Sequence, residues 1–279
     1  MFLGIFLVFF LISTSLPTYA ANIQIKVDGV VIRSDVDPEI RNNHTMVPLR
    51  VISENLGAKV NWSDSEITLT KKDMQIILKL NNNKTMKNGK TVLIDVKPYI
   101  KNNRIFVPLR FLAETFGCDV NYTNSTVTVD TEPLVIDGVK VKALQQEYHM
   151  TMGGVVQQIK GNAYNKDIYN IFIENKGSEV EAPENYSWQY TMDTLGSYYK
   201  VGQYDFLDFE GNSIKRFEIY TLNKTFPEEL LKRYPEVLLY DATENQWYLF
   251  SDTASQSINQ IVDSADQNGF LKIISNTVA

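Results

Sequence analysis

Residues 107–117 read VPLRFLAETFG, and residues 47–57 read VPLRVISENLG, so nearly the same stretch occurs twice at an offset of 60 residues. Both stretches predict a short helix. A Pro stands where the first turn needs no amide donor, and a Gly stands where the last turn needs a left-handed stop. These residues are Pro48 and Gly57 in the first copy and Pro108 and Gly117 in the second.

Each predicted helix has one apolar face, because apolar residues recur at steps of three and four. The opposite face carries Arg50 and Glu54, repeated as Arg110 and Glu114, at a spacing that allows pairing along the helix. An exposed pair of this kind adds only about 0.3–0.5 kcal/mol. We therefore expect the apolar faces to hold both helices on a core. They consist of Leu49, Ile52 and Leu56, and of Leu109, Leu112, Ala113 and Phe116.

Strands are predicted on both sides of each helix. In residues 23–27 apolar and polar side chains alternate, and an Asp-Gly turn follows. We interpret residues 76–80 as the equivalent strand of the second repeat. A longer polar connection and an Asn-Gly turn follow that strand. Residues 67–70 and 127–130 alternate again after the helices. Trp62 and Tyr122 occupy the same position in the two copies. We expect each to pack beneath its own helix.

The combined pattern resembles the copper amine oxidase N-terminal-like domain, also called the stalk domain. It covers residues 22–131 as two tandem repeats, 22–71 and 74–131. The resemblance implies a small antiparallel sheet curved around one helix, found in tandem on exported proteins of Gram-positive bacteria, with no established chemistry of its own. The motif residues are Pro48, Arg50, Glu54, Gly57, Trp62, Pro108, Arg110, Glu114, Gly117 and Tyr122.

The family's name does not imply amine oxidation in this chain. The oxidases hold copper through three His side chains, beside a quinone formed from the Tyr of an Asn-Tyr-Asp/Glu sequence, whereas this chain has only His44 and His149. Its two relevant Asn-Tyr pairs are followed by Thr123 and Ser187. We therefore expect no copper, no other metal and no cofactor. His44 matches Arg104 in the repeat, and we interpret it as a solvated loop residue.

The first twenty residues predict an export signal. They carry no charged side chain, and an apolar run from Phe2 to Ile12 precedes small residues that end at Ala20. This is the form of a signal peptide cleaved after Ala20, whereas a membrane span needs roughly 20 apolar residues. Because no basic residue precedes the run, retention as a weak anchor stays open. Cys118 is the single cysteine, so we expect it to be a small buried residue outside any internal disulfide.

Residues 132–279 predict a separate, acidic α+β domain. They carry 12 Lys and Arg against 21 Asp and Glu, whereas residues 22–131 carry 15 against 12. This charge disfavours binding to nucleic acid. The patterns predict strands at 148–158, 168–173, 237–240, 246–250 and 270–274, a short helix after a capping box of Thr225 and Glu228, and an amphipathic helix around 258–265. The overall fold class is therefore α+β with mostly antiparallel sheets.

Two kinds of site arise in this acidic domain. Trp188 and Trp247 could stack against the sugars of a wall polymer, with core packing as the alternative for each. Asp205, Asp208 and Glu210 form the closest group of carboxylates, and a pair of carboxylates is the requirement of a glycosidase. Polar and aromatic residues mostly alternate around them, which favours a half-buried strand over a catalytic site.

We therefore expect a secreted or cell-wall-associated protein without catalytic residues. The repeats would act as a spacer or docking platform, and residues 132–279 would recognise a wall polysaccharide or another envelope protein. After cleavage of the signal we expect no membrane span. The alternative is an extracellular hydrolase of the glycosidase type with its active site in residues 132–279.

Overall fold

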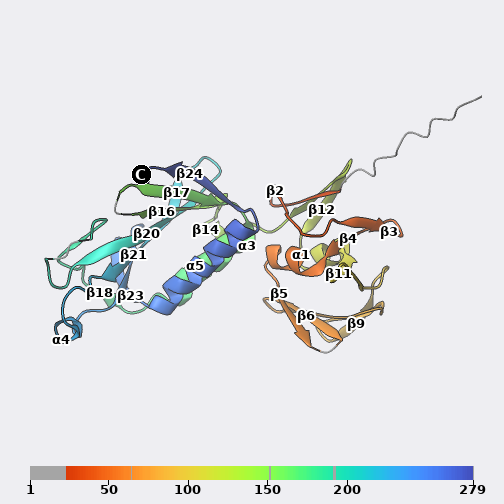
Figure 1. The fold of residues 1–279 in the computed structure, drawn as a ribbon, viewed down its shortest axis with the longest axis horizontal. Helices are drawn as coiled ribbons and strands as arrows, with labels where there is room; N and C mark the ends of the chain where they lie inside the picture. The colour runs from red at the N-terminus through yellow and green to blue at the C-terminus, as the bar shows by residue number, and fades with distance from the viewer. Residues whose placement is uncertain (1–22, 64, 151, 191–192, 279) are drawn as a thin grey trace, which may run out of the picture.

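A computed structural model describes residues 23–63, 65–150, 152–190 and 193–278. It confirms the predicted class, an α+β fold with mostly antiparallel sheets. Figure 1 shows two parts next to each other, which we call the stalk (residues 23–131) and the head (residues 132–278). The predicted export signal, residues 1–20, lies outside the described residues.

The stalk contains two short helices among thirteen strands in its described residues. The helices are α1 (Leu49–Asn55) and α2 (Leu109–Thr115). The strands are β1 (Gln24–Val27), β2 (Val30–Val31), β3 (Glu39–Arg41), β4 (His44–Pro48), β5 (Lys59–Ser63), β6 (Glu66–Lys71), β7 (Met74–Lys79), β8 (Lys84–Lys87), β9 (Lys90–Leu93), β10 (Tyr99–Lys101), β11 (Arg104–Pro108), β12 (Asp119–Thr123) and β13 (Thr126–Asp130).

The two repeats meet in a central sheet of order β10-β11-β4-β3. Val47 of β4 pairs with Val107 of β11, so equivalent positions of the two repeats face each other. The helices follow directly, and the apolar faces predicted for them are buried. Each Pro of the motif ends its strand, and the helix begins one residue later. Gly57 and Gly117 adopt φ angles of 80° and 73°, which confirms the predicted left-handed stops.

The two outer sheets exchange strands between the repeats. One has the order β12-β13-β1-β2, and the other has the order β5-β6-β7-β8-β9. Each therefore combines the last strands of one repeat with the first strands of the other. The repeats interlock, and neither forms a complete sheet of its own. The pairing of β1 with β13 is parallel, whereas β4 with β11 and β6 with β7 pair antiparallel between the same two repeats.

The match of residues 23–27 with residues 76–80 is wrong. At the offset of 60 residues β1 corresponds to β8, and the hairpin turn at Asp28 corresponds to the turn at Asn88. The strand β7 is inserted between β6 and β8 in its sheet. Its counterpart in the first repeat would fall in residues 14–19, outside the described residues. Both stretches alternate like a strand, and only the pairing shows which of them is equivalent.

His44 is also not the solvated loop residue that the sequence predicts. It begins β4, and its Nε2 atom lies 3.1 Å from Oδ2 of Asp95 in the other repeat. The equivalent residues with the two repeats exchanged are Arg104 of the second repeat and Asp35 of the first, and they also form an ion pair. The two polar contacts cross between the repeats at matching positions, but their side chains are largely exposed, so they add little to stability.

The head contains a nine-stranded sheet of order β18-β23-β22-β21-β20-β16-β17-β24, in which β19 also pairs with β20. Its strands are β16 (Ala143–His149), β17 (Gly154–Ile159), β18 (Glu179–Val180), β19 (Tyr186–Ser187), β20 (Tyr198–Leu207), β21 (Ser213–Leu222), β22 (Val237–Asp241), β23 (Gln246–Phe250) and β24 (Leu271–Asn276). A separate hairpin is formed by β14 (Val135–Ile136) and β15 (Val139–Lys140).

Two long helices, α3 (Asn162–Glu174) and α5 (Asp252–Gln267), lie side by side against the head sheet (Figure 1). The ring of Phe172 on α3 stacks on Phe217 of β21 with 4.6 Å between the centroids. The strand predicted at 168–173 is wrong, since these residues belong to α3. That window is dense in residues that favour strands, but Ile168 and Phe172 are one helical turn apart and are both buried.

The short helix α4 (Glu228–Leu231) begins after Pro227, which stands at its N-cap position. The capping box predicted from Thr225 is therefore not formed there. The longer helix α5 does have a side-chain cap, because Oγ of Ser251 accepts a hydrogen bond from the amide of Ala254 at 3.0 Å.

Polar contacts join the stalk to the start of α3. The carboxylate of Asp28 accepts hydrogen bonds from the amides of Thr131 and Asn162, each at 2.9 Å. Asn162 is the first residue of α3, so Asp28 satisfies one of the free amides of that helix. Burial raises the pKa of Asp28 above its ordinary value, against the opposing effect of these donors. Nearby, the hydroxyl of Tyr164 donates to Oδ1 of Asn55 at 2.7 Å.

Gly57 serves both as the helix stop and as a close contact between stalk and head. A Cβ atom at this position would lie 3.2 Å from Cβ of Ala163 on α3, whereas a Cβ at Gly117 would meet no atom within 4 Å. Alanine in the left-handed conformation costs about 1–2 kcal/mol at both positions. We expect Gly57→Ala to lose about 1 kcal/mol more than Gly117→Ala in urea unfolding, because the head contact adds overpacking. Equal losses would contradict this contact.

Candidate ligand-binding site

The head has a hollow of about 970 Å³ at the end of the β16–β17 hairpin. Its aromatic and charged lining comes from three regions: the end of β16, the segment after β19 and the beginning of β20. The side chains that matter below are Glu147, His149, Trp188, Tyr190, Tyr199 and Lys200.

Trp188 lies at the centre of this set of side chains. The imidazole of His149 stacks on its indole ring with 4.0 Å between the centroids. The Lys200 ammonium lies 4.4 Å from the ring centroid, which is cation–π distance. The protein therefore holds the indole in one orientation, as a preorganised binding site requires.

Two polar contacts fix the surroundings of the indole, one buried and one about one-third exposed. Nζ of Lys200 lies 2.7 Å from Oε2 of Glu218, and both side chains are nearly buried. On the other side, Nε2 of His149 lies 2.9 Å from Oε1 of Glu147. The rim therefore presents hydrogen-bonding groups of both charges next to aromatic rings. This combination suits a polar ligand with apolar ring faces, such as a sugar.

The hollow lies at the end of the head that is remote from the stalk. The β16–β17 hairpin has its loop at residues 150–153, beside the hollow, while β17 leads toward the stalk contact of α3 at its other end. In Figure 1 the C-terminus lies beside β17 and β24 at the upper edge of the head. The amide of Thr277 donates to the carbonyl of Gly154 at 3.0 Å, so the chain end borders the hollow.

Trp247, the second tryptophan proposed for ligand binding, is only 5% exposed. Its ring packs against Tyr220 and Tyr240, each with a centroid distance of 4.8 Å. Trp247 is therefore a core residue, which is the alternative to ligand binding given for it above. It offers no open ring face to a ligand. The sequence does not distinguish it from Trp188, because both tryptophans have aromatic and polar neighbours.

Trp62 and Tyr122 do not pack beneath their helices, which corrects the prediction for these repeat positions. They are 46% and 44% exposed, although each pairs with a buried residue, Ile67 or Val127, because β5 and β12 are edge strands of their sheets. The guanidinium carbon of Arg110 lies 4.9 Å from the Tyr122 ring centroid, so this tyrosine contacts the polar side of its helix.

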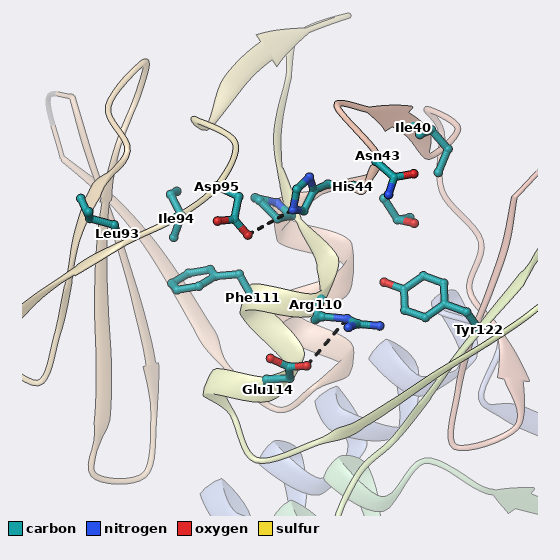
Figure 2. Close-up of a pocket in the computed structure, with 12 residues that line it drawn as sticks. Ile40, Asn43, His44, Leu93, Ile94, Asp95, Arg110, Phe111, Glu114 and Tyr122 are labelled. Carbon is teal, nitrogen blue, oxygen red and sulfur yellow. Dashed lines mark hydrogen bonds and ion pairs between the residues drawn. The ribbon is translucent and has the colours of Figure 1, made fainter.

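The stalk has a hollow of its own, of about 640 Å³, between α2 and strands of both repeats. Figure 2 shows Arg110 between Glu114 and Tyr122, with Phe111 and Leu93 on the opposite side. The Arg110–Glu114 distance is 3.7 Å, and Arg50–Glu54 is 3.4 Å in the first repeat, as the spacing predicts. Both pairs are exposed, so they contribute little to stability.

The carboxylates considered for hydrolysis have structural roles. Asp205 is buried and pairs with Nε of Arg216 at 2.6 Å. Asp208 accepts hydrogen bonds from the side-chain amide of Asn212 and from backbone amides of the β20–β21 turn, which lower its pKa. Glu210 is exposed in the same turn. None of these contacts places two carboxyl groups across a cleft, as glycoside hydrolysis requires.

Within the described ranges, no three His, Cys, Asp or Glu side chains gather closely enough to hold a metal ion. Cys118 is buried and free, as the sequence predicts, and burial raises the pKa of its thiol. In the part of the chain that the structure describes, no helix has both the length and the apolar composition needed to span a bilayer.

In its described residues the stalk is an interlocked α+β repeat domain. Residues 26–131 match the family model described as Copper amine oxidase N-terminal domain, which confirms the resemblance seen in the sequence. This domain by itself is non-catalytic. No curated protein and no solved structure matches the chain.

Proposed function

We propose that the protein is an exported, non-catalytic protein of the cell envelope. Its stalk acts as a spacer, and its head recognises a wall polysaccharide through the hollow around Trp188. The observation that carries this proposal is the position of the hollow. Aromatic and charged side chains gather at the end of the head remote from the stalk, where a polymer has access to them.

The junction supports the spacer role. A spacer holds a binding domain at a fixed distance only when it is firmly attached to that domain. Three separate contacts attach α3 of the head to the stalk. These are the Asp28 carboxylate on Asn162, the Tyr164 hydroxyl on Asn55 and the close approach of Gly57 to Ala163. These contacts attach the head to the stalk at α3, and the shared sheets hold the two repeats of the stalk together.

Cosedimentation with purified insoluble peptidoglycan tests the recognition role. We expect the wild-type protein to sediment with the polymer, and Trp188→Ala to bind at least tenfold more weakly because the ring that positions His149 and Lys200 in the hollow is lost. Trp62→Ala is the matched control, since Trp62 is an exposed tryptophan on the stalk. Tyr190→Ala gives a second variant of the hollow should Trp188→Ala lower the yield of folded protein.

Equal loss in Trp62→Ala and Trp188→Ala would rule out the hollow as the binding site. If the wild-type protein did not sediment, recognition of the wall polymer would be wrong, and a partner protein would become the better hypothesis. The hydrolase alternative predicts that reducing sugars are released from the same polymer and that Asp205→Asn or Asp208→Asn abolishes this release.

A further inference from the structure

A cleft of about 900 Å³ separates the stalk from the head at their junction. One wall is formed by β5, by the turn between β6 and β7 and by the end of α1. The other wall is formed by the first turns of α3 and the end of α5. Clefts between two folded parts of a chain are a preferred place for small ligands. This cleft lies far from the hollow around Trp188, and its role does not depend on the proposed function.

Lysines from both walls enter the cleft. Lys59, Lys71 and Lys72 come from the stalk, and Lys166 comes from α3. Among the described residues, Lys166 forms an ion pair with Glu132 at 3.6 Å. The three stalk lysines form no ion pair in that part of the chain, so their charges are not matched by a direct partner.

The acidic residues of the cleft balance only part of this charge. Glu54 is already paired with Arg50, and Glu132 is paired with Lys166. Asp167 is the remaining carboxylate that lines the cleft, and it faces Lys59, Lys71 and Lys166 without forming an ion pair within the described ranges. When the residues that already form ion pairs are left out, the cleft contains three lysine ammonium groups and one carboxylate. The local excess is therefore two positive charges.

This excess is costly in the absence of an anion. Burial and the neighbouring Lys72 ammonium both lower the pKa of Lys166. Lys59 and Lys72 are exposed and Lys71 is half-buried, so water screens part of the repulsion among these like charges, and a bound anion reduces it further. Uncharged amides of Asn61, Asn170 and Gln267 line the same cleft and can donate hydrogen bonds to oxygen atoms.

We propose that this cleft binds an oxyanion with two negative charges, a phosphate group in chemical terms, between the stalk lysines and α3. The charge of the ligand matches the local excess. Residues 132–279 carry 12 Lys and Arg against 21 Asp and Glu, so most of the head repels anions, and three of the four lysines of the cleft come from the stalk. Because both walls contribute contacts, the anion would also strengthen the attachment of the head to the stalk.

Calorimetric titration of the full chain with inorganic phosphate at low salt tests this site. We expect one phosphate per chain, and binding at least tenfold weaker in the double variant Lys71→Gln/Lys72→Gln. The matched control is Lys84→Gln/Lys90→Gln, which removes the same charge from exposed positions of β8 and β9 outside the cleft. We expect its affinity for phosphate to equal that of the wild-type protein. Acetate, with one charge, should bind more weakly than phosphate.

Three results would overturn the proposal. They are the absence of phosphate binding to the wild-type chain, equal weakening in both double variants, and several weak sites per chain, which would indicate general electrostatic attraction. A thermal unfolding scan with and without phosphate gives an independent readout, because a ligand that binds only the folded state raises the unfolding temperature. No rise in the wild-type protein would likewise contradict the site. These outcomes are separate from sedimentation with peptidoglycan.

Discussion

Asp241→Asn is expected to cost about 3–5 kcal/mol in the free energy of unfolding, the largest single effect in the head. Asp241 is fully buried, and its Oδ2 atom lies 2.8 Å from Nζ of Lys215 and 2.9 Å from Nζ of Lys176. Removing its charge leaves two ammonium groups in a low-dielectric site with only Glu244 to balance them. Urea unfolding followed by far-UV circular dichroism measures this loss.

The control is Glu236→Gln. Its partner Lys224 lies at a similar distance, 2.9 Å, but both side chains are exposed, so we expect a loss below about 1 kcal/mol. Should Asp241→Asn cost no more than this control, the buried network would not stabilise the head.

The same network makes the head sensitive to acid. Hydrogen bonds from Lys176 and then Lys215 lower the pKa of Glu244 to about 2. Between this value and the ordinary value of 4.5, the folded state holds fewer protons than the unfolded state. The contribution of Glu244 is therefore complete above that range and is lost as the pH falls through it. The destabilisation caused by Glu244→Gln should accordingly be smaller at pH values near 3 than at neutral pH.

Asp28→Ala is expected to cost about 2–4 kcal/mol, because the amides of Thr131 and Asn162 would lose their acceptor at the junction between stalk and head. The cost of placing alanine at the positive φ angle of 50° adds to this loss. We expect the unfolding free energy to fall and small-angle scattering to show a wider distribution of orientations between stalk and head.

Asp137→Ala provides the matched control. Asp137 precedes a Gly in a hairpin turn of the same kind, with a φ angle of 49°, and is exposed. The backbone strain is therefore equal, and the difference between the two variants isolates the hydrogen bonds of Asp28. A difference below about 1 kcal/mol, with unchanged scattering, would show that the junction does not depend on this carboxylate.

The sequence alone determined the features of the stalk that depend on local conformation. The period of three to four residues identified the buried faces of α1 and α2, and the glycines at 57 and 117 identified their ends. Helix periodicity and the left-handed angle are properties of a few neighbouring residues, so a single sequence contains them. The repeat made them more certain, because each signal occurs twice in register.

Tertiary structure alone decided which strands pair and which rings are exposed. The exchange of strands between the repeats and the insertion of β7 rest on hydrogen bonds between residues far apart in the chain. Trp188 and Trp247 look alike in sequence, yet the first borders an open hollow and the second lies in a core. Alternation shows that a strand has two faces, but the sheets and helices that meet there decide which face is covered. The sequence likewise does not reveal that Asp241 is buried or that the lysines of the junction cleft lie near one another. The neighbours of these residues come from separate elements of the chain.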